Sequence, residues 1–406
     1  MCIRDRLFSN THIIWGLDIG TSICKAFISH NEFKHLKNHL TIKLKSKLGH
    51  YLIDICPFWV SNIIFTIMSL QQIDFSKVLN DEQVYDHIMA HYDQLGKDWI
   101  NHQWRWMNAV YRAFKDHYKY MIIISLVEKT LQFYDQMNIK LSYEQYYSKN
   151  FLQIDKFSIT ELCEKLQLPK ETVRRKVLEL EKLGVLKRQK KQIIIDRRSF
   201  SFIKPERQMK YTAGYILKIS EILTKEKLYF KKLEPKMIEN VLKKNFSMCW
   251  RWFYRMQIPM IIGYHDMFED LTTFHVWGTV CMNQAFNYGA SLEQKNGHNQ
   301  AKNYIDYQRE MVKGDYNSFN EELVRGIKAR SNGVSAMSVA DMTGIPRATV
   351  IRKCKFLIKN EYLRLNEKKQ YILTGFNVQR VLPYQKLIFK NKAKFIRKVL
   401  NLLTIS

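Results

Sequence analysis

One pattern of 39 residues occurs twice in this chain of 406 residues. The first copy runs from Ser158 to Asp196, and the second follows 177 positions later, without a gap, from Ser335 to Leu373. The shared residues include Pro169, Thr172, Val173, Arg175, Lys176, Leu180 and Leu186, which recur as Pro346, Thr349, Val350, Arg352, Lys353, Leu357 and Leu363. Two copies of one pattern are much harder to obtain by chance than one. The chain is therefore expected to build the same small structure twice.

Each copy predicts a short helix, a tight turn, a second helix and a β-hairpin. Pro169 fits the first turn of the second helix, where its missing N–H is not needed, and Gly184 ends that helix with a left-handed backbone. Two strand-like runs, 185–187 and 192–195, flank the polar residues 188–191. The apolar positions recur at helical spacing and must face a core: Ile159, Leu162, Cys163 and Leu166 in the first helix, and Val173, Val177 and Leu180 in the second.

The face opposite this apolar stripe is basic in both copies. The first copy carries Lys170, Thr172, Arg174, Arg175 and Lys176 on its second helix, and Lys187, Arg188, Lys190 and Lys191 around the hairpin turn. The second copy carries Arg347, Thr349, Arg352 and Lys353 on the helix, and Lys368 and Lys369 in the turn. A solvated helix face is the alternative to a binding surface. The regular placement in both copies favours DNA.

The run ITELCEKLQLPKETVRRKVLELEKLGVLKR, residues 159–188, resembles the reading head of bacterial winged helix-turn-helix transcription regulators of the MarR, GntR and Crp type. The resemblance covers about forty residues of each copy and implies three helices, a β-hairpin wing and DNA binding. It indicates neither the target nor an effector. Two departures, Ile351 in place of Arg174 and Asn360-Glu361 in place of Leu183-Gly184, predict that the second copy binds DNA less strongly or serves partly as an interface.

A recognition helix enters the major groove, and its outward side chains meet the base edges. Arg174, Arg175 and Arg352 are suited to bidentate pairing with guanine, worth roughly 1–3 kcal/mol of discrimination each. Thr172 and Thr349 can contact phosphate or a thymine methyl group. The lysines and arginines of the wing are expected to contact phosphates, which gives affinity that falls steeply with salt.

Composition agrees with a polyanionic partner. The net charge is +27 and the pI is about 9.6, which suits nucleic acid or an anionic membrane surface. The seven cysteines form no CxxC pair, so neither a disulfide framework nor a zinc knuckle is indicated, and a reducing cytoplasm fits best. His87 and His91 share a helix face, and His265 to His275 holds a cluster of acidic residues and histidines. Both are interpreted as structural or solvated groups, and no metal is expected.

The N-terminal residues 1–67 differ from the rest and are interpreted as a doubtful, non-native extension. Residues 17–22, LDIGTS, resemble the first phosphate motif of the actin-like ATPases, but the second phosphate loop and the adenosine motif of that family are missing. Residues 51–70 are apolar, but Asp54, Pro57 and Asn62 interrupt them, so no membrane span is expected.

The predicted architecture is mainly α, with two winged helix-turn-helix domains joined by an α-helical domain. The expected segments are a helical domain at 68–138, a winged-helix domain at 139–198, a helical aromatic-rich domain at 199–288, a flexible connector at 289–318, a second winged-helix domain at 319–376 and a basic C-terminal helix at 377–406. Residues 143–147 and 320–324 are candidates for the first helix of each winged-helix domain.

The predicted function is sequence-specific binding of double-stranded DNA in transcription regulation. A plasmid-type or phage-type replication initiator and a winged-helix protein-interaction module remain as alternatives. No catalytic constellation is evident, so no enzyme activity, cofactor or small-molecule ligand is predicted. The helical domain leaves room for a homodimer.

Overall fold

The computed structural model describes residues 11–19, 22–29 and 77–405, except 149, 155–157, 190–191, 199–203, 297–332 and 375. The chain forms two compact units, Met1–Asp74 and Phe75–Ser406. In the first unit, β1 (Thr11–Ile19) and β2 (Ser22–Ser29) pair antiparallel, with Ile19 opposite Ser22. Gly20 and Thr21 of the phosphate-like motif, and the apolar residues 51–70, lie outside the described residues.

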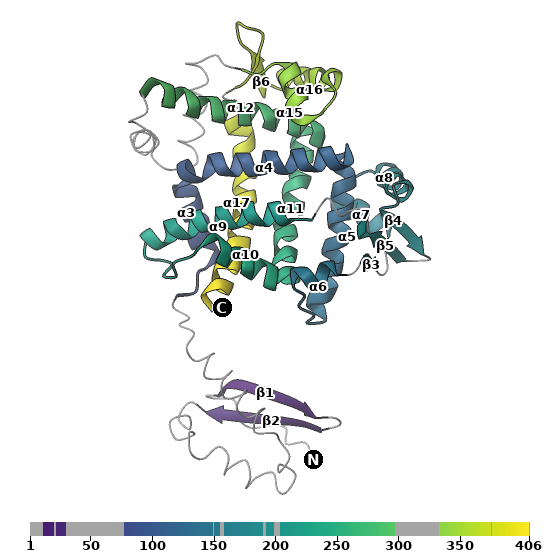
Figure 1. The fold of residues 1–406 in the computed structure, drawn as a ribbon, viewed down its shortest axis with the longest axis vertical. Coiled ribbons are helices and arrows are strands. Elements are labelled where there is room, and N and C mark those ends of the chain that lie inside the picture. Colours follow the sequence, from purple (N-terminus) through teal and green to yellow (C-terminus); the bar gives the residue numbers. More distant parts are fainter. Residues whose placement is uncertain are drawn as a thin grey trace. The chain divides into compact units, whose positions relative to one another are not determined.

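The second unit is mainly helical, which confirms the mainly α part of the predicted fold class (Figure 1). Its first half contains α3 (Asp81–Ala90), α4 (Tyr92–Phe114), α5 (His117–Gln136), α6 (Tyr143–Tyr147), β3 (Phe151–Ile154), α7 (Ile159–Leu166), α8 (Lys170–Lys182), β4 (Leu186–Gln189), β5 (Gln192–Asp196) and α9 (Glu206–Lys225). Its second half contains α10 (Pro235–Lys244), α11 (Phe246–Phe268), α12 (Leu271–Asn296), α15 (Ala336–Thr343), α16 (Arg347–Lys359), β6 (Leu363–Leu365), β7 (Tyr371–Leu373) and α17 (Phe376–Ile405).

The 39-residue repeat folds identically in its helical part. The boundaries of α15 and α16 lie 177 positions after those of α7 and α8, at both ends of each helix. Ser158 and Ser335 cap the first helix by accepting a hydrogen bond from the N–H three residues later. Pro169 and Pro346 precede the second helix with φ of −56° and −54°. These boundaries agree with those expected from the sequence.

The hairpins after each helix pair differ in size. The first copy has a three-stranded antiparallel sheet of order β3-β5-β4. In the second copy β6 pairs with β7, and Val334 forms a bridge with Tyr371. Residues 328–331, which correspond to β3, lie outside the described residues. α6 coincides with residues 143–147, the predicted first helix of the first copy. The corresponding residues 320–324 of the second copy lie outside the described residues.

A second duplication links the helices outside this repeat. The boundaries of α10 and α11 lie 154 positions after those of α3 and α4 at both ends, and α12 begins 154 positions after α5. α4 and α11 both end at a left-handed residue, Lys115 with φ of 52° and Glu269 with φ of 62°. Asp116 and Asp270 then accept hydrogen bonds from the first N–H groups of α5 and α12. The second unit is therefore an internal duplication of one helical and hairpin module.

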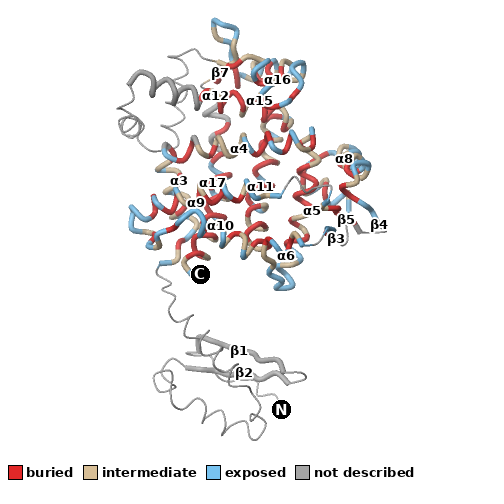
Figure 2. The backbone as a smooth tube through the Cα atoms, in the orientation of Figure 1, coloured by how far each residue is buried: buried red, intermediate tan, exposed pale blue. Residues whose placement is uncertain are grey.

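The two halves pack reciprocally. α4 of the first half packs on α12 of the second, as α11 packs on α5; α3 packs on α17, as α10 packs on α9. The equivalent glutamines Gln103 and Gln257 each bond to a tyrosine of the other half, at 3.1 Å to Tyr264 and 3.3 Å to Tyr120. Such mutual exchange of contacts is the signature of a two-fold, isologous interface. The helical segments predicted as separate domains thus share one core (Figure 2).

Aromatic side chains fill this core, as expected from their helical spacing. Phe246, Trp250 and Phe253 stack along α11, with ring centroids 5.4 and 4.8 Å apart. Lys392 of α17 is enclosed among rings, with Nζ 3.3 Å from the centroid of Trp99. Burial lowers the pKa of Lys392 well below its usual value.

Two further features bear on the sequence predictions. α12 extends to Asn296, so the backbone of residues 289–296 in the expected connector is helical, and 297–318 lie outside the described residues. α17 covers the expected C-terminal helix. No helix among the described residues combines the length and hydrophobicity required to cross a bilayer.

Candidate nucleic-acid interface

α8 and α16 each bury one stripe of their surface. Val173, Val177 and Leu180 of α8 are fully buried, and Val350, Cys354 and Leu357 occupy the same positions of α16 with the same burial. These stripes pack on α7 and α15, respectively. This packing directs the polar faces of both helices outward.

The structure places most of the predicted helix residues on these outward faces. Lys170, Arg174, Arg175, Arg347 and Arg352 are exposed, whereas Thr172 and Thr349 are half-buried at matching positions. Arg174 lies 3.9 Å from Glu171, and both side chains remain largely exposed. No described carboxylate forms an ion pair with Arg175 or Arg352. These arginines are consequently available to an external anion.

Lys176 and Lys353 have a different role. Lys176 Nζ lies 2.5 Å from Asp116 Oδ2 and 2.9 Å from Glu179 Oε1, and Lys353 pairs with Asp270. Both lysines are half-buried, and each contacts the cap residue of α5 or α12. Although burial raises the pKa of Asp270, hydrogen bonds from Lys353 and Thr273 bring it below its ordinary value. We call these two pairs the head anchors.

Further contacts fix each helix pair on its long helix. In the first copy, Lys165 Nζ lies 2.6 Å from Glu128 and Lys129 Nζ lies 2.7 Å from Glu161, which joins α7 to α5. In the second copy, the Leu373 N–H donates to Gln284 Oε1 of α12 at 2.8 Å. The two outward faces are therefore presented by a fixed support rather than by a free linker.

The two head anchors lie near each other, where α5 and α12 begin. Burial lowers the pKa of His117 to about 4, while Asp116 and Asp270 both act on it in the opposite direction. The rings of His117 and His275 lie 5.3 Å apart, and Arg112 of α4 donates to the Met342 carbonyl of α15. α8 and α16 lie on either side of this corner (Figure 1).

In the first wing, the two described cations that the sequence assigned to phosphates lie near carboxylates of the same head. Arg188 is engaged with Glu181, with 2.9 Å between Nη2 and Oε2, and Lys187 lies 3.9 Å from Asp196. Lys190 and Lys191 lie outside the described residues. In the second hairpin Lys368 and Lys369 are both exposed.

Several exposed cations of the second copy escaped the sequence analysis. Lys355, Lys359 and Arg364 lie on α16 and β6 and are exposed. Lys355 occupies the position held by Leu178 in the first copy, so the second surface gains a charge there and loses one at Ile351. The signal that could have identified them is the difference in charge between aligned positions of the two copies.

The acidic and histidine clusters are dispersed in the structure. His275 is buried against Asn108 Oδ1 at 2.7 Å, Asp270 belongs to a head anchor, and His265 lies beside Asp266. His87 Nδ1 bonds to the Gln83 carbonyl, and His91 lies 3.6 Å from Glu226. Among the described residues, no three histidine, cysteine, aspartate or glutamate side chains are grouped so as to hold a metal ion.

Comparison with known proteins gave no match to a family model, to a curated protein or to a solved structure.

Proposed function

We propose that this chain is a sequence-specific double-stranded DNA-binding protein that regulates transcription through two winged helix-turn-helix heads. The observation that carries the proposal is the repeated exposed basic face of α8 and α16, supported in the same way in both halves. The order α6, β3, α7, α8, β4, β5 in the first half supports the assignment of a winged-helix domain with its wing. The second half retains the helix pair and the hairpin.

The side chains divide into two kinds of contact. Arg174, Arg175 and Arg352 stand on the outward face of the second helix, the element that enters the major groove in this class of head. They are assigned to guanine edges. Lys170, Arg347 and the exposed hairpin lysines are assigned to phosphates, which position the protein without reading sequence.

The reciprocal packing of the halves supports a two-fold arrangement of the proposed target. Two heads related by an approximate two-fold axis read a site of matching symmetry, because the symmetry of the site mirrors that of the protein. The target is therefore an inverted repeat, with half-sites roughly 34 Å apart, or one helical turn. One chain supplies both heads, which in most such regulators come from two subunits of a dimer.

The proposal is tested by selecting randomised duplexes with the full chain at two salt concentrations. The variants are Arg174→Ala with Arg175→Ala in the first head, Arg352→Ala in the second, and Arg207→Ala as a control on the exposed face of α9. We expect an enriched inverted repeat, with each head variant relaxing one half-site and the control relaxing neither. Weak binding without a motif, insensitive to all of these arginines, would refute sequence-specific reading.

A protein-interaction role has one observation in its favour. Leu178 and Leu183 on and after α8 are 43% and 56% exposed, and Met337 on α15 is 50% exposed. Exposed apolar side chains beside a recognition surface suit a protein partner. Motif-free DNA binding in the selection above, together with loss of a co-purifying protein on Leu178→Ser, would favour this second function.

A further inference from the structure

Two cations of the first half lie against the second head, at the corner where α5 and α12 begin. Arg112, in the last turn of α4, donates from Nη2 to the Met342 carbonyl of α15 at 3.4 Å. Lys115 follows α4 directly, and a methyl group on Gly344 would lie 3.8 Å from its Nζ. α4 also packs on α15. Both cations therefore lie beside the turn that joins α15 to α16.

These two side chains keep their positive charge available. Both are exposed, and no described carboxylate forms an ion pair with Arg112 or Lys115. Asp116, the next residue along the chain, is engaged in a head anchor. Asp341 of α15 is exposed, and no ion pair joins it to either cation. Lys115 Nζ lies 5.8 Å from the Tyr111 ring centroid, a contact that orients the ammonium group without neutralising it.

The helical duplication shows that this basic pair belongs to one side of the molecule. α4 and α11 have equivalent boundaries 154 positions apart. Under this offset Arg112 corresponds to Asp266 and Lys115 to Glu269, and both carboxylates are exposed. The charge is thus reversed at two equivalent positions. Core packing does not explain this reversal, because all four side chains are exposed.

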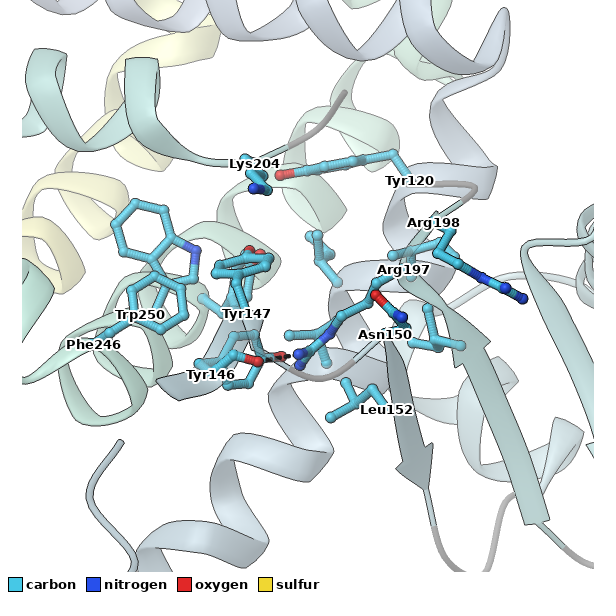
Figure 3. A pocket seen from close by; sticks show the side chains of 15 residues that line it. Tyr120, Tyr146, Tyr147, Asn150, Leu152, Arg197, Arg198, Lys204, Phe246 and Trp250 are labelled. Atoms are coloured by element: carbon cyan, nitrogen blue, oxygen red, sulfur yellow. Dashed lines mark hydrogen bonds between the residues drawn. The ribbon is translucent and has the colours of Figure 1, made fainter. Parts of the chain in front are cut away.

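Two arginines at the junction of the first head have a different environment. Arg198 lies 2.8 Å from Asp196 Oδ2, which offsets its charge. Arg197 is half-buried and donates to the Tyr146 carbonyl, on the wall of a pocket between α5, α6 and α11 (Figure 3). These arginines support the junction between head and core, whereas the corner pair stands at its exposed edge.

The position of the α15–α16 turn indicates what the corner cations meet. In heads of this class, the first residues of the recognition helix contact base edges in the major groove, while the preceding helix crosses the phosphate backbone. α16 begins at Arg347, three residues after Gly344. A cation beside this turn therefore lies next to the phosphates at the edge of the groove that α16 enters.

We propose that Arg112 and Lys115 form a phosphate-binding site that the first half of the chain supplies to the second head. The site binds the DNA backbone of the half-site that Arg352 reads. It offsets the cation that the second head lacks at Ile351, where the first head has Arg174. This inference rests on the proposed function, because it concerns the same bound duplex.

The first test measures how the affinity of the full chain for its selected duplex depends on salt. Arg112→Gln with Lys115→Gln, the corner variant, removes both charges. Arg207→Gln with Lys210→Gln removes an arginine and a lysine at the same spacing from the exposed face of α9 and is the matched control. The corner variant should select the same motif as the parent chain, since phosphate contacts carry no sequence information, and this also shows that its heads remain folded.

The expected effect follows from the release of counterions. Two lost phosphate contacts reduce the slope of log K against log salt concentration by roughly 1.8. Between about 50 and about 200 mM salt, the corner variant should therefore lose roughly tenfold less affinity than the parent chain. The α9 control should match the parent chain.

A second measurement locates the contact on the duplex. Uncharged methylphosphonates replace phosphates either in the half-site that Arg352→Ala relaxes or in the half-site that Arg174→Ala with Arg175→Ala relaxes. We expect the first replacement to remove the difference in affinity between the parent chain and the corner variant. The second replacement should leave that difference unchanged.

The outcomes separate this inference from the function on which it rests. A selected motif with the same salt dependence for the parent chain and the corner variant would overturn the inference and leave the proposed function standing. A difference that persists when the second head's half-site carries methylphosphonates would overturn it as well. Binding without a motif by every variant would overturn the proposed function, and this inference with it.

Discussion

At the residue scale, the two copies of the repeat use glycine at different left-handed positions. The residue after the first helix is Gln167 in one copy and Gly344 in the other, with φ of 53° and 72°. The residue near the end of the second helix is Gly184 in one copy and Glu361 in the other, with φ of 71° and 60°. At these two positions, each copy therefore holds one non-glycine residue in a conformation that costs L-residues roughly 1–2 kcal/mol.

This difference predicts opposite effects at equivalent positions. Glu361→Gly is expected to raise the free energy of unfolding by about 0.5–1 kcal/mol, because glycine removes the steric cost of the left-handed backbone. The higher conformational entropy of glycine in the unfolded chain offsets only part of this gain. Gly184→Ala should lower it by a similar amount. The urea midpoints of the two variants check this. A lower midpoint for Glu361→Gly would show that the carboxylate contributes more than the strain.

Lys392 predicts a pH-dependent stability. Its pKa is depressed in the folded chain by burial, so between that depressed pKa and the ordinary one the unfolded chain binds more protons than the folded chain. Stability therefore rises with pH toward the ordinary lysine pKa of about 10.4, above which the unfolded chain no longer binds more protons than the folded chain. Lys392→Met keeps the volume and removes the titration.

The measurement is the difference in urea midpoint between Lys392→Met and the parent chain from pH 7 to pH 10. We expect Lys392→Met to be the more stable protein at pH 7 and the difference to shrink as the pH rises. Lys390→Met, at an exposed position of the same helix, is the control and should show little pH-dependent difference. A constant difference for Lys392→Met would mean that this lysine keeps its ordinary pKa in the aromatic enclosure.

At the element scale, we expect each head anchor to hold its own helix, α8 or α16, on the helical core. Asp116→Asn keeps an efficient N-cap for α5 but removes the charge that pairs with Lys176. Loss of a charged hydrogen bond costs roughly 1–3 kcal/mol. We expect hydrogen exchange to accelerate in α8 and to stay unchanged in α16, and the reverse for Asp270→Asn.

Asp266→Asn, an exposed change at the same corner, supplies the control for both anchor variants. Acceleration in both helices with either anchor variant would show that the heads open together. Acceleration in neither would show that the apolar stripes and the other ion pairs suffice to hold them.

The helix boundaries inside the repeat were predictable, whereas the anchors were not. Ser158, Pro169 and Gly184 are local signals that begin or end a helix whatever surrounds it. The pairing of Lys176 with Asp116 joins residues 60 positions apart, and Lys176 shares its helix face with residues that do point outward. The docking of each head on α5 or α12 decides the direction of the two anchor lysines. This docking is not visible in the sequence, so the sequence pattern assigned both lysines to DNA.

At the scale of the whole molecule, the helical duplication was invisible in the sequence. Few residues are shared across the 154-position offset, among them Gln103 with Gln257 and Asp116 with Asp270. Core positions accept any apolar side chain of suitable size, so Val84 and Ile238 both remain fully buried without identity. The 39-residue repeat stayed recognisable because turns and caps tolerate fewer residue types.

The reciprocal halves lead to a prediction about stoichiometry and spacing. If one chain presents both heads, one chain should occupy one inverted repeat, and joining the heads should raise affinity by effective concentration, on the order of 10²–10⁴-fold over one head. Inserting five base pairs between the half-sites turns the second half-site to the opposite face of the DNA. Because the heads are docked on a common core rather than linked by a free chain, this insertion should remove nearly all of that gain.

The measurement combines analytical ultracentrifugation of the complex with titration of the parent and five-base-pair-expanded sites. The Arg352→Ala chain on the parent site is the comparison, because it loses the second head while the spacing is intact. We expect a mass of one chain per duplex, and similar affinities for the expanded site and for Arg352→Ala. Two chains per inverted repeat would instead mean that each chain uses one head on DNA, and that the second copy of the repeat serves as the contact between chains.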